Sequence, residues 1–141
     1  MPHSLLSPEG KPLPIYKGKR LLVAEDNLLN REILLEILKD RECLADAAEN
    51  GQMAVSMFLE KPSGYYDAIL MDIRMPVMDG YEATAAIRGL DRADADIPII
   101  AMTADAFSED IQRCLECGMN DHLAKPIDIQ AVTCNLKKYL K

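Results

Sequence analysis

The stretch "RLLVAEDN", residues 20–27, predicts both how the chain folds and where its chemistry lies. Residues 20–24 form an apolar run typical of a buried strand, and the run ends in two adjacent carboxylates, Glu25 and Asp26. Like charges are unfavourable at the end of a core strand, because two unit charges about 4 Å apart repel by roughly 4 kcal/mol at an effective dielectric constant near 20. The pair therefore needs an explanation beyond the end of a strand.

The size and composition of the chain exclude several classes of protein. Its 141 residues suffice for one domain with a substantial core, and a hydrophobic content of 49% argues against disorder. No apolar stretch approaches the roughly 20 residues of a membrane span, and the N-terminus lacks the apolar region of a signal peptide, so we expect a cytoplasmic protein. The formal charge of −7 predicts no direct nucleic-acid binding by this chain.

The chain divides into two parts by composition. Residues 1–18 hold Pro2, Pro8, Pro12 and Pro14 without a periodic apolar pattern, which predicts a flexible leader or linker. From Lys19 onward, short apolar runs alternate with amphipathic stretches. We therefore expect a single domain over residues 19–141.

This second part predicts a three-layer α/β fold. Strands are expected at residues 20–24, 44–48, 68–71, 97–102 and 122–124, with helical patterns after each of them. The N-caps expected for these helices are Asn27, Asn50, Asp79, Ser108 and Asp128, and Gly118 is the expected end of the fourth helix. Strict alternation predicts a (βα)₅ doubly wound five-stranded parallel sheet, with the flavodoxin-like strand order 2-1-3-4-5.

Polar side chains end four of the five predicted strands. The first strand ends in Glu25 and Asp26, the third in Asp72, the fourth in Thr103 and the fifth in Lys125. In doubly wound sheets the ligand crevice lies outside the carboxyl ends of the strands, so these groups should converge there. A single polar residue at a strand end would only mark where the core stops, but polar residues at four strand ends together indicate a functional site.

The charge balance of this cluster points to a cation and an anion. Lys125 offsets one of the three carboxylates, and a divalent cation with hard oxygen preference, Mg²⁺ or Mn²⁺, would balance the remainder. A metal ion beside a hydroxyl and an ammonium group suits phosphoryl chemistry, with Thr103 and Lys125 contacting phosphoryl oxygens. Asp72, at the end of the middle strand, is the candidate nucleophile.

Cysteine spacing gives a second, weaker pattern. Cys114 and Cys117 could be half of a zinc site or a redox pair, but His3 and His122 supply no second ligand pair at a suitable spacing. We expect two thiols on one helical turn, one of them facing the core.

Four segments together resemble a known family. "VAEDNLLNREI", "DAILMDIRMPVMDGYEA", "IIAMTADAF" and "GMNDHLAKPI" look like the receiver domain of two-component response regulators, in family order from Lys19 to Leu140. These sequence motifs are most similar to those in the receivers of hybrid sensor histidine kinases. The resemblance implies either a stand-alone regulator or, preferably, a fragment of such a kinase with the leader as linker.

The resemblance also implies residue roles. Asp72 would accept a phosphoryl group from a phosphohistidine on a histidine kinase or histidine phosphotransfer domain, and the chain would catalyse its own phosphorylation and dephosphorylation. Glu25, Asp26, Asp72 and the backbone carbonyl of Arg74 would hold the metal. Thr103 would be the switch hydroxyl that moves toward the phosphoryl group. Lys125, which precedes a cis proline, would be the lysine that contacts this group. Phosphorylation would shift the surface formed by the fourth helix, fifth strand and fifth helix. Membrane attachment would come only through a parent kinase.

One position departs from the family, and three other functions compete. His122 stands where many receivers carry a tyrosine or phenylalanine switch, so we expect it to be a partly exposed residue with an open role in switching. A flavodoxin-like flavin carrier would need a Ser-, Thr- and Gly-rich loop in place of the acidic "EDNLLN". A magnesium-dependent phosphohydrolase would need a substrate-capping insertion, and a non-phosphorylated docking module would not need the full set of site residues.

Overall fold

The computed structural model describes residues 17–104 and 108–140. These residues form a parallel five-stranded sheet in the order β2-β1-β3-β4-β5, so the predicted fold class and strand order are confirmed. The strands are β1 (Arg20–Ala24), β2 (Leu44–Ala48), β3 (Ala68–Asp72), β4 (Ile99–Thr103) and β5 (Asp121–Ala124). The helices are α1 (Leu28–Asp40), α2 (Gly51–Glu60), α3 (Gly80–Arg88), α4 (Ser108–Cys117) and α5 (Ile129–Tyr139).

The bounds of β1 and β2 agree with the prediction, and the other strands differ by one or two residues. Strand β4 begins after Pro98, which has no N–H to donate to a ladder. Strands β3 and β4 each extend to a polar residue, Asp72 and Thr103, because backbone pairing continues past the apolar run: Asp72 pairs with Met102, and Thr103 with Ala124. The candidate side chains at these two positions therefore stand on the sheet itself.

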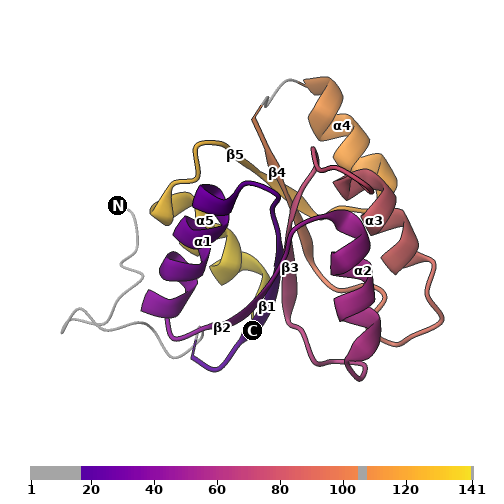
Figure 1. The fold of residues 1–141 in the computed structure, drawn as a ribbon, viewed down its shortest axis with the longest axis horizontal. Coiled ribbons are helices and arrows are strands. Elements are labelled where there is room, and N and C mark those ends of the chain that lie inside the picture. Colours follow the sequence, from indigo (N-terminus) through magenta and orange to yellow (C-terminus); the bar gives the residue numbers. More distant parts are fainter. Residues whose placement is uncertain (1–16, 105–107, 141) are drawn as a thin grey trace.

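Helices cover both faces of the sheet (Figure 1). Helices α1 and α5 pack on one face, and α2, α3 and α4 on the other, each over its own hydrophobic cluster. Alternate residues of β1 belong to the two clusters. Leu21 and Val23 face α1 and α5, and Leu22 and Ala24 lie on the face covered by α2, α3 and α4. Strands β3 and β4 are buried along their whole length, as expected for the centre of a doubly wound sheet.

The chain reverses its direction of winding between β1 and β3. From β1 it proceeds outward to β2, and from β3 it proceeds the other way to β4 and β5. Neighbouring strands that lead to opposite sides leave a crevice between their following loops, and in this class of sheet ligands bind there. Glu25 and Asp26 follow β1 and Asp72 ends β3, so they flank this crevice.

Capping side chains fix the starts of four helices as predicted. Asn27, Asn50, Asp79 and Asp128 each accept a hydrogen bond from a backbone N–H in the first turn, and Asp79 forms a complete capping box with Glu82. The prediction for the fourth helix is off by one residue, because α4 begins at Ser108 itself, and the residue before it lies outside the described ranges. Gly118, with φ of +108°, follows the end of α4 as expected.

Three further predictions concern the cysteines, the leader and membrane-spanning helices. Cys114 is buried and Cys117 partly buried on one turn of α4, and neither forms a disulfide, as expected for structural thiols. Residues 1–16 of the predicted leader lie outside the described part of the chain, so its flexibility stays a prediction. Among the described residues, no helix combines the length and apolarity needed to cross a bilayer.

Arg88 joins three segments at the edge of the sheet opposite the crevice. It donates hydrogen bonds to the carbonyl oxygens of Gly118 at 2.9 Å and Ala95 at 2.7 Å, and to Oδ1 of Asn120 at 2.9 Å. The same Asn120 oxygen accepts a hydrogen bond from the backbone N–H of Ile99 at 2.8 Å. Arg88 thus ties the end of α3 to the loop that follows α4 and to the start of β4.

Two glycines allow helices to approach the loop after β3. A Cβ atom on Gly80 would collide with the backbone oxygen of Asp72 and lie 2.8 Å from Cα of Ile73. A Cβ atom on Gly51 would collide with the backbone oxygen of Met78. The first turn of α3 therefore packs directly on the backbone of Asp72, and the first turn of α2 packs on the same loop at Met78.

We expect Gly80→Ala to destabilise the domain by about 1–3 kcal/mol, because the new methyl group meets backbone atoms that cannot rotate away. Urea denaturation followed by circular dichroism measures the change. Gly89→Ala is the matched control, since Gly89 has φ of −83° and its Cβ would meet its nearest neighbour at 3.4 Å. Equal stability of the two variants would contradict this account of the packing.

Candidate functional site

The two acidic residues that follow β1 lie in different environments. The backbone N–H of Glu25 donates to the carbonyl oxygen of Ala48 at 3.0 Å, which continues the pairing with β2 by one residue. The side chain of Glu25 is fully buried, whereas Asp26 is exposed. Asn27 then caps α1, so both carboxylates lie between the end of a strand and the start of a helix.

Asp72 occupies the centre of the same edge. It is 2% exposed, and its Oδ1 accepts a hydrogen bond from the backbone N–H of Arg74 at 3.2 Å. Its Oδ2 accepts a hydrogen bond from Nζ of Lys125 at 2.8 Å. A carboxylate at the end of a fully buried strand is thus fixed in orientation by one backbone and one side-chain donor.

Lys125 contacts two of the three carboxylates. Its Nζ lies 2.9 Å from Oε1 of Glu25 and 2.8 Å from Oδ2 of Asp72. Its backbone N–H donates to the carbonyl oxygen of Thr103 at 2.8 Å, and the Lys125–Pro126 bond is cis, as the resemblance implied. The lysine, which directly follows β5, therefore joins the ends of β1, β3 and β4.

Burial and the neighbouring charges shift the pKa values in this cluster. Burial raises the pKa of Glu25 above 4.5, and Asp72 raises it further, while Lys125 partly opposes both. Burial lowers the pKa of Lys125, but its contacts with Asp72 and Glu25 outweigh this effect and hold the pKa above 10.5. Lys125 is therefore a cation at neutral pH, and further positive charge near Glu25 would favour the ionised form of Glu25.

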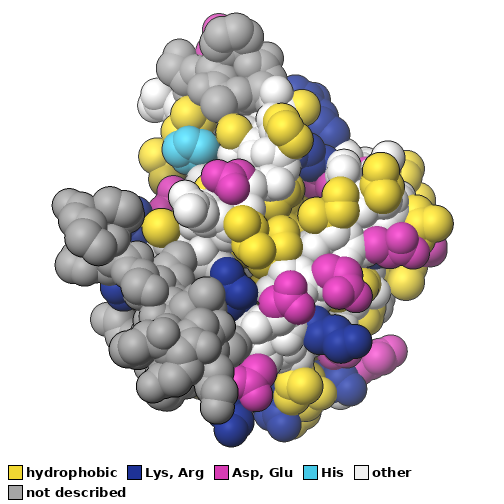
Figure 2. Space-filling view, turned by 90° about the vertical axis from the view of Figure 1, so that its left-hand side faces the viewer, with side chains coloured by type: hydrophobic (Ala, Val, Ile, Leu, Met, Phe, Trp, Pro, Cys, Tyr) yellow, Lys and Arg dark blue, Asp and Glu magenta, His cyan; other side chains and the backbone are white. Residues whose placement is uncertain are grey.

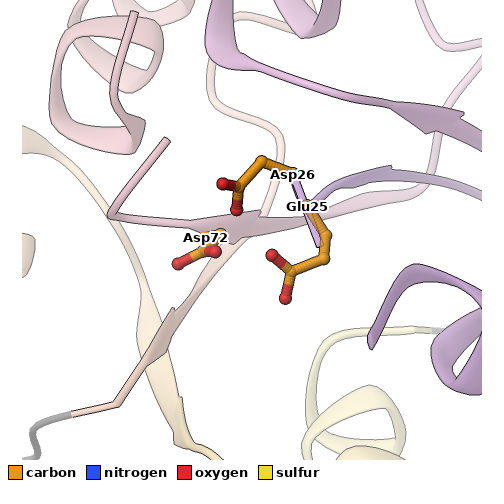
Figure 3. A group of neighbouring side chains, drawn as sticks. All are labelled: Glu25, Asp26 and Asp72. Atoms are coloured by element: carbon orange, nitrogen blue, oxygen red, sulfur yellow. The ribbon is translucent and has the colours of Figure 1, made fainter. Parts of the chain in front are cut away.

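The three carboxylates fit a divalent metal ion. Ligand oxygens of Glu25, Asp26 and Asp72 lie within 4.8 Å of one another and face a common space at the ends of β1 and β3 (Figure 3). Buried Oε1 of Glu25 has an ion-pair contact with Lys125, but its geometry is outside that of a hydrogen bond, so this oxygen retains unused acceptor capacity. Clustered hard oxygen ligands, one of them exposed, match the preference of Mg²⁺.

The remaining predicted site residues lie around this cluster. Thr103 is buried at the end of β4, one position beyond the partner of Asp72 in the ladder. His122 lies on the edge strand β5 beside Ala101, with its side chain 36% exposed, as expected for a partly exposed residue. Neither position reveals whether the residue acts as a switch, so both roles stay predictions.

Arg74 connects the loop after β3 to α4. Its side chain is mostly exposed, and one guanidinium nitrogen lies 3.6 Å from Oδ1 of Asp110. The hydroxyl of Tyr81 donates to the same oxygen at 3.4 Å, and the guanidinium of Arg113 stacks 4.0 Å from the centre of the Tyr81 ring. The predicted metal contact of the Arg74 backbone carbonyl stays a prediction.

Sequence reasoning overlooked Arg31, which also reaches the site. Its guanidinium donates to the backbone oxygen of Glu25 at 2.8 Å and to that of Asp26 at 3.5 Å, and it lies 3.6 Å from a carboxylate oxygen of Glu49. The available signal was a basic residue one turn into the helix that follows the acidic pair. That signal is weak, because arginines are common on helix surfaces.

Comparison with known proteins agrees with this geometry. The chain matches the response regulator receiver domain over residues 21–137. The chain therefore belongs to the family of receiver domains of two-component signalling.

Curated relatives include large kinases. Hybrid signal transduction histidine kinase B of Dictyostelium discoideum is 40% identical over 135 residues, which cover 88% of this chain and 7% of the relative. The peroxide stress-activated histidine kinase mak2 of Schizosaccharomyces pombe is 42% identical over 125 residues, covering 86% of this chain and 5% of the kinase. The chain thus spans a small fraction of the length of the curated relatives it matches.

Solved structures add two informative neighbours. A sensor histidine kinase receiver domain from Pseudomonas aeruginosa, which has a magnesium ion coordinated in its active-site cleft, is 38% identical with a TM-score of 0.78; the match covers 86% of this chain and 97% of that one. The receiver domain of the Saccharomyces cerevisiae response regulator Ssk1, solved with the histidine phosphotransfer protein Ypd1, gives 30% identity, a TM-score of 0.78 and coverage of 87% and 89%.

We expect Lys125→Met to lower the free energy of unfolding of the metal-free protein by about 3 kcal/mol, because buried Glu25 and Asp72 would lose their common cationic partner. Urea denaturation in EDTA measures the change. Asp26→Asn should instead raise the urea midpoint, since it removes a like charge from the cluster. A Lys125→Met protein as stable as the wild type, or a less stable Asp26→Asn protein, would contradict this electrostatic account.

Proposed function

We propose that this receiver domain accepts a phosphoryl group on Asp72, in a Mg²⁺-dependent transfer from a phosphohistidine of a partner protein. The observation that carries the proposal is the position of Asp72: buried, hydrogen-bonded to Lys125, and within 4.8 Å of the carboxylates of Glu25 and Asp26. Ion pairs with Lys125 would account for Asp72 and Glu25 but not for a third carboxylate, Asp26, beside them. An acidic crevice also favours a cation over the phosphate of a flavin, which disfavours the flavodoxin-like alternative.

The chemistry follows from the charges of the site. An oxygen of the Asp72 carboxylate forms a new P–O bond while the P–N bond of phosphohistidine breaks, and the imidazole leaves with the electron pair. A bound Mg²⁺, held by Glu25, Asp26, Asp72 and the backbone carbonyl of Arg74, supplies charge neutralisation for the phosphoryl oxygens. Lys125, in contact with Asp72, would supply a second positive charge.

The product suggests how the signal leaves the site. Phosphorylation adds negative charge at the position where Lys125 now bonds Asp72, and the Thr103 hydroxyl can donate a hydrogen bond to a phosphoryl oxygen. Movement of Thr103 at the end of β4 would act on the neighbouring surface of α4, β5 and α5. His122, on β5, belongs to that surface and is proposed to contribute to switching.

A histidine kinase or histidine phosphotransfer domain is the proposed partner, in keeping with the Ssk1–Ypd1 neighbour. A donor must reach Asp72 across the edge where α1 begins, and that edge presents exposed Leu28 and Leu29. Hydrophobic side chains stand at the surface among charged ones on the side of the molecule formed by α1 and α5 (Figure 2). We further propose a cytoplasmic location and a parent hybrid kinase, through which membrane attachment would come.

Incubation with Mg²⁺ and acetyl phosphate should add one phosphoryl group, measured by intact mass. Asp72→Asn should abolish the adduct, because the amide is a far weaker nucleophile, and EDTA should prevent it in the wild-type chain. Thr133→Ala, a change in α5, is the control. It should still form the adduct, which would show that a substitution in the fold does not by itself abolish labelling. Absence of an adduct under conditions that label another receiver domain, or equal labelling of Asp72→Asn, would refute the proposal.

Replacing an exposed leucine by lysine should separate partner docking from chemistry. Leu29→Lys, at a side chain 65% exposed, is expected to slow phosphoryl transfer from a histidine phosphotransfer protein at least tenfold, because about 1.4 kcal/mol of lost apolar contact already has this effect. Labelling by acetyl phosphate should be unchanged. Leu59→Lys, at an exposed leucine of α2, is the matched control. Equal loss with both donors would place the defect in the site rather than in docking.

A further inference from the structure

We propose that Arg31 is a positioning residue for the metal-binding carboxylates, acting through the backbone that carries them. The inference rests on the proposed function, because it concerns the affinity of the same site for its cation. Arg31 is the fourth residue of α1, and its side chain is 13% exposed. Side chains on a helix lean toward its N-terminus, so the guanidinium reaches back over the first turn to the acidic pair.

The contacts of Arg31 fix the backbone between strand and helix. The N–H of Glu25 is bonded to Ala48 at 3.0 Å, and its carbonyl oxygen to Arg31 at 2.8 Å, so both polar groups of this buried backbone are held. A second, longer contact at 3.5 Å reaches the carbonyl oxygen of Asp26. Arg31 therefore sets the two peptide planes that follow β1.

Those planes determine where the carboxylates lie. Adjacent side chains of an extended strand point to opposite faces, yet the carboxylates of Glu25 and Asp26 both lie within 4.8 Å of Asp72. The backbone must therefore leave the strand conformation at this point and be held there. Both contacts come from one guanidinium nitrogen, Nη1, whose two N–H groups are fixed in the plane of the group, a geometry that an ammonium group does not reproduce.

The charge of Arg31 has the opposite effect on the metal. A positive charge close to the acidic pair repels a divalent cation, and the ion pair with Glu49, whose side chain is 65% exposed, screens it only partly. If Arg31 acted only as a charge, its removal would tighten metal binding. If it positions the carboxylates, its removal weakens binding, so the sign of the change distinguishes the two roles.

The test is Mn²⁺ binding to the unphosphorylated full chain, measured by electron paramagnetic resonance with Mg²⁺ competition. We expect Arg31→Met to raise the dissociation constant at least about tenfold, the effect typical of losing a residue that orients metal ligands. Arg31→Lys, which keeps the charge and can keep one contact, should give an intermediate value. Glu49→Gln should stay within about twofold of the wild type, because the ion pair is largely exposed.

Controls separate the possible failures. Arg20→Met makes the same change of net charge at the opposite end of β1 and should bind Mn²⁺ as the wild type does. Unchanged or tighter binding by Arg31→Met would overturn the inference, as would a loss of thermal stability without a change in affinity. If Arg31→Met does not fold, weaker binding by folded Arg31→Lys supports the inference and wild-type binding overturns it. Failure of the wild type to bind, or undiminished binding by Asp26→Asn, would instead refute the proposed metal site, and the inference with it.

Discussion

The arrangement of the site depends on like charges that the fold does not allow to separate. Glu25 and Asp26 directly follow β1, and Asp72 ends β3. The backbones of these two strands are paired, and their apolar residues fill the core on both faces. Moving the backbones that carry the carboxylates apart would require unpairing β1 from β3. Hydrophobic burial therefore holds the acidic groups together, and Lys125 offsets part of the repulsion by contacting two of them. The remaining negative charge gives the crevice its preference for a cation.

Much of this was predictable because the fold and the site share one pattern. Apolar runs that alternate with helical stretches define a parallel sheet, and a parallel sheet gathers all its carboxyl ends at one edge. The sequence therefore predicted that Asp72, Thr103 and Lys125 would meet Glu25 and Asp26, although they are far apart in the chain. The errors were small and local: Pro98 cannot donate to the ladder, and backbone pairing extends through Asp72 and Thr103 regardless of their polarity.

Two kinds of contact were not predictable: those made by long side chains, and those that require a glycine because no side chain fits. The sequence indicates only weakly that Arg31 turns back onto carbonyl oxygens rather than outward to water. The need for glycine at Gly80 likewise comes from a close approach to the backbone of Asp72, which depends on how α3 docks. Such contacts follow from side-chain direction and helix placement in three dimensions, and periodicity carries no information on either.

Helix α4 is held very differently at its two ends. At the C-terminal end, Arg88 makes three hydrogen bonds of 2.7 to 2.9 Å that include the residues just beyond the helix, and Cys114 lies in the core. At the N-terminal end, the polar contacts of Asp110 are longer, at 3.4 and 3.6 Å, and one of them involves a side chain 72% exposed. Among the described contacts, those of Asp110 would therefore break before those of Arg88 if α4 were displaced. Asp110 is also the residue of α4 that pairs with Arg74, two residues beyond Asp72.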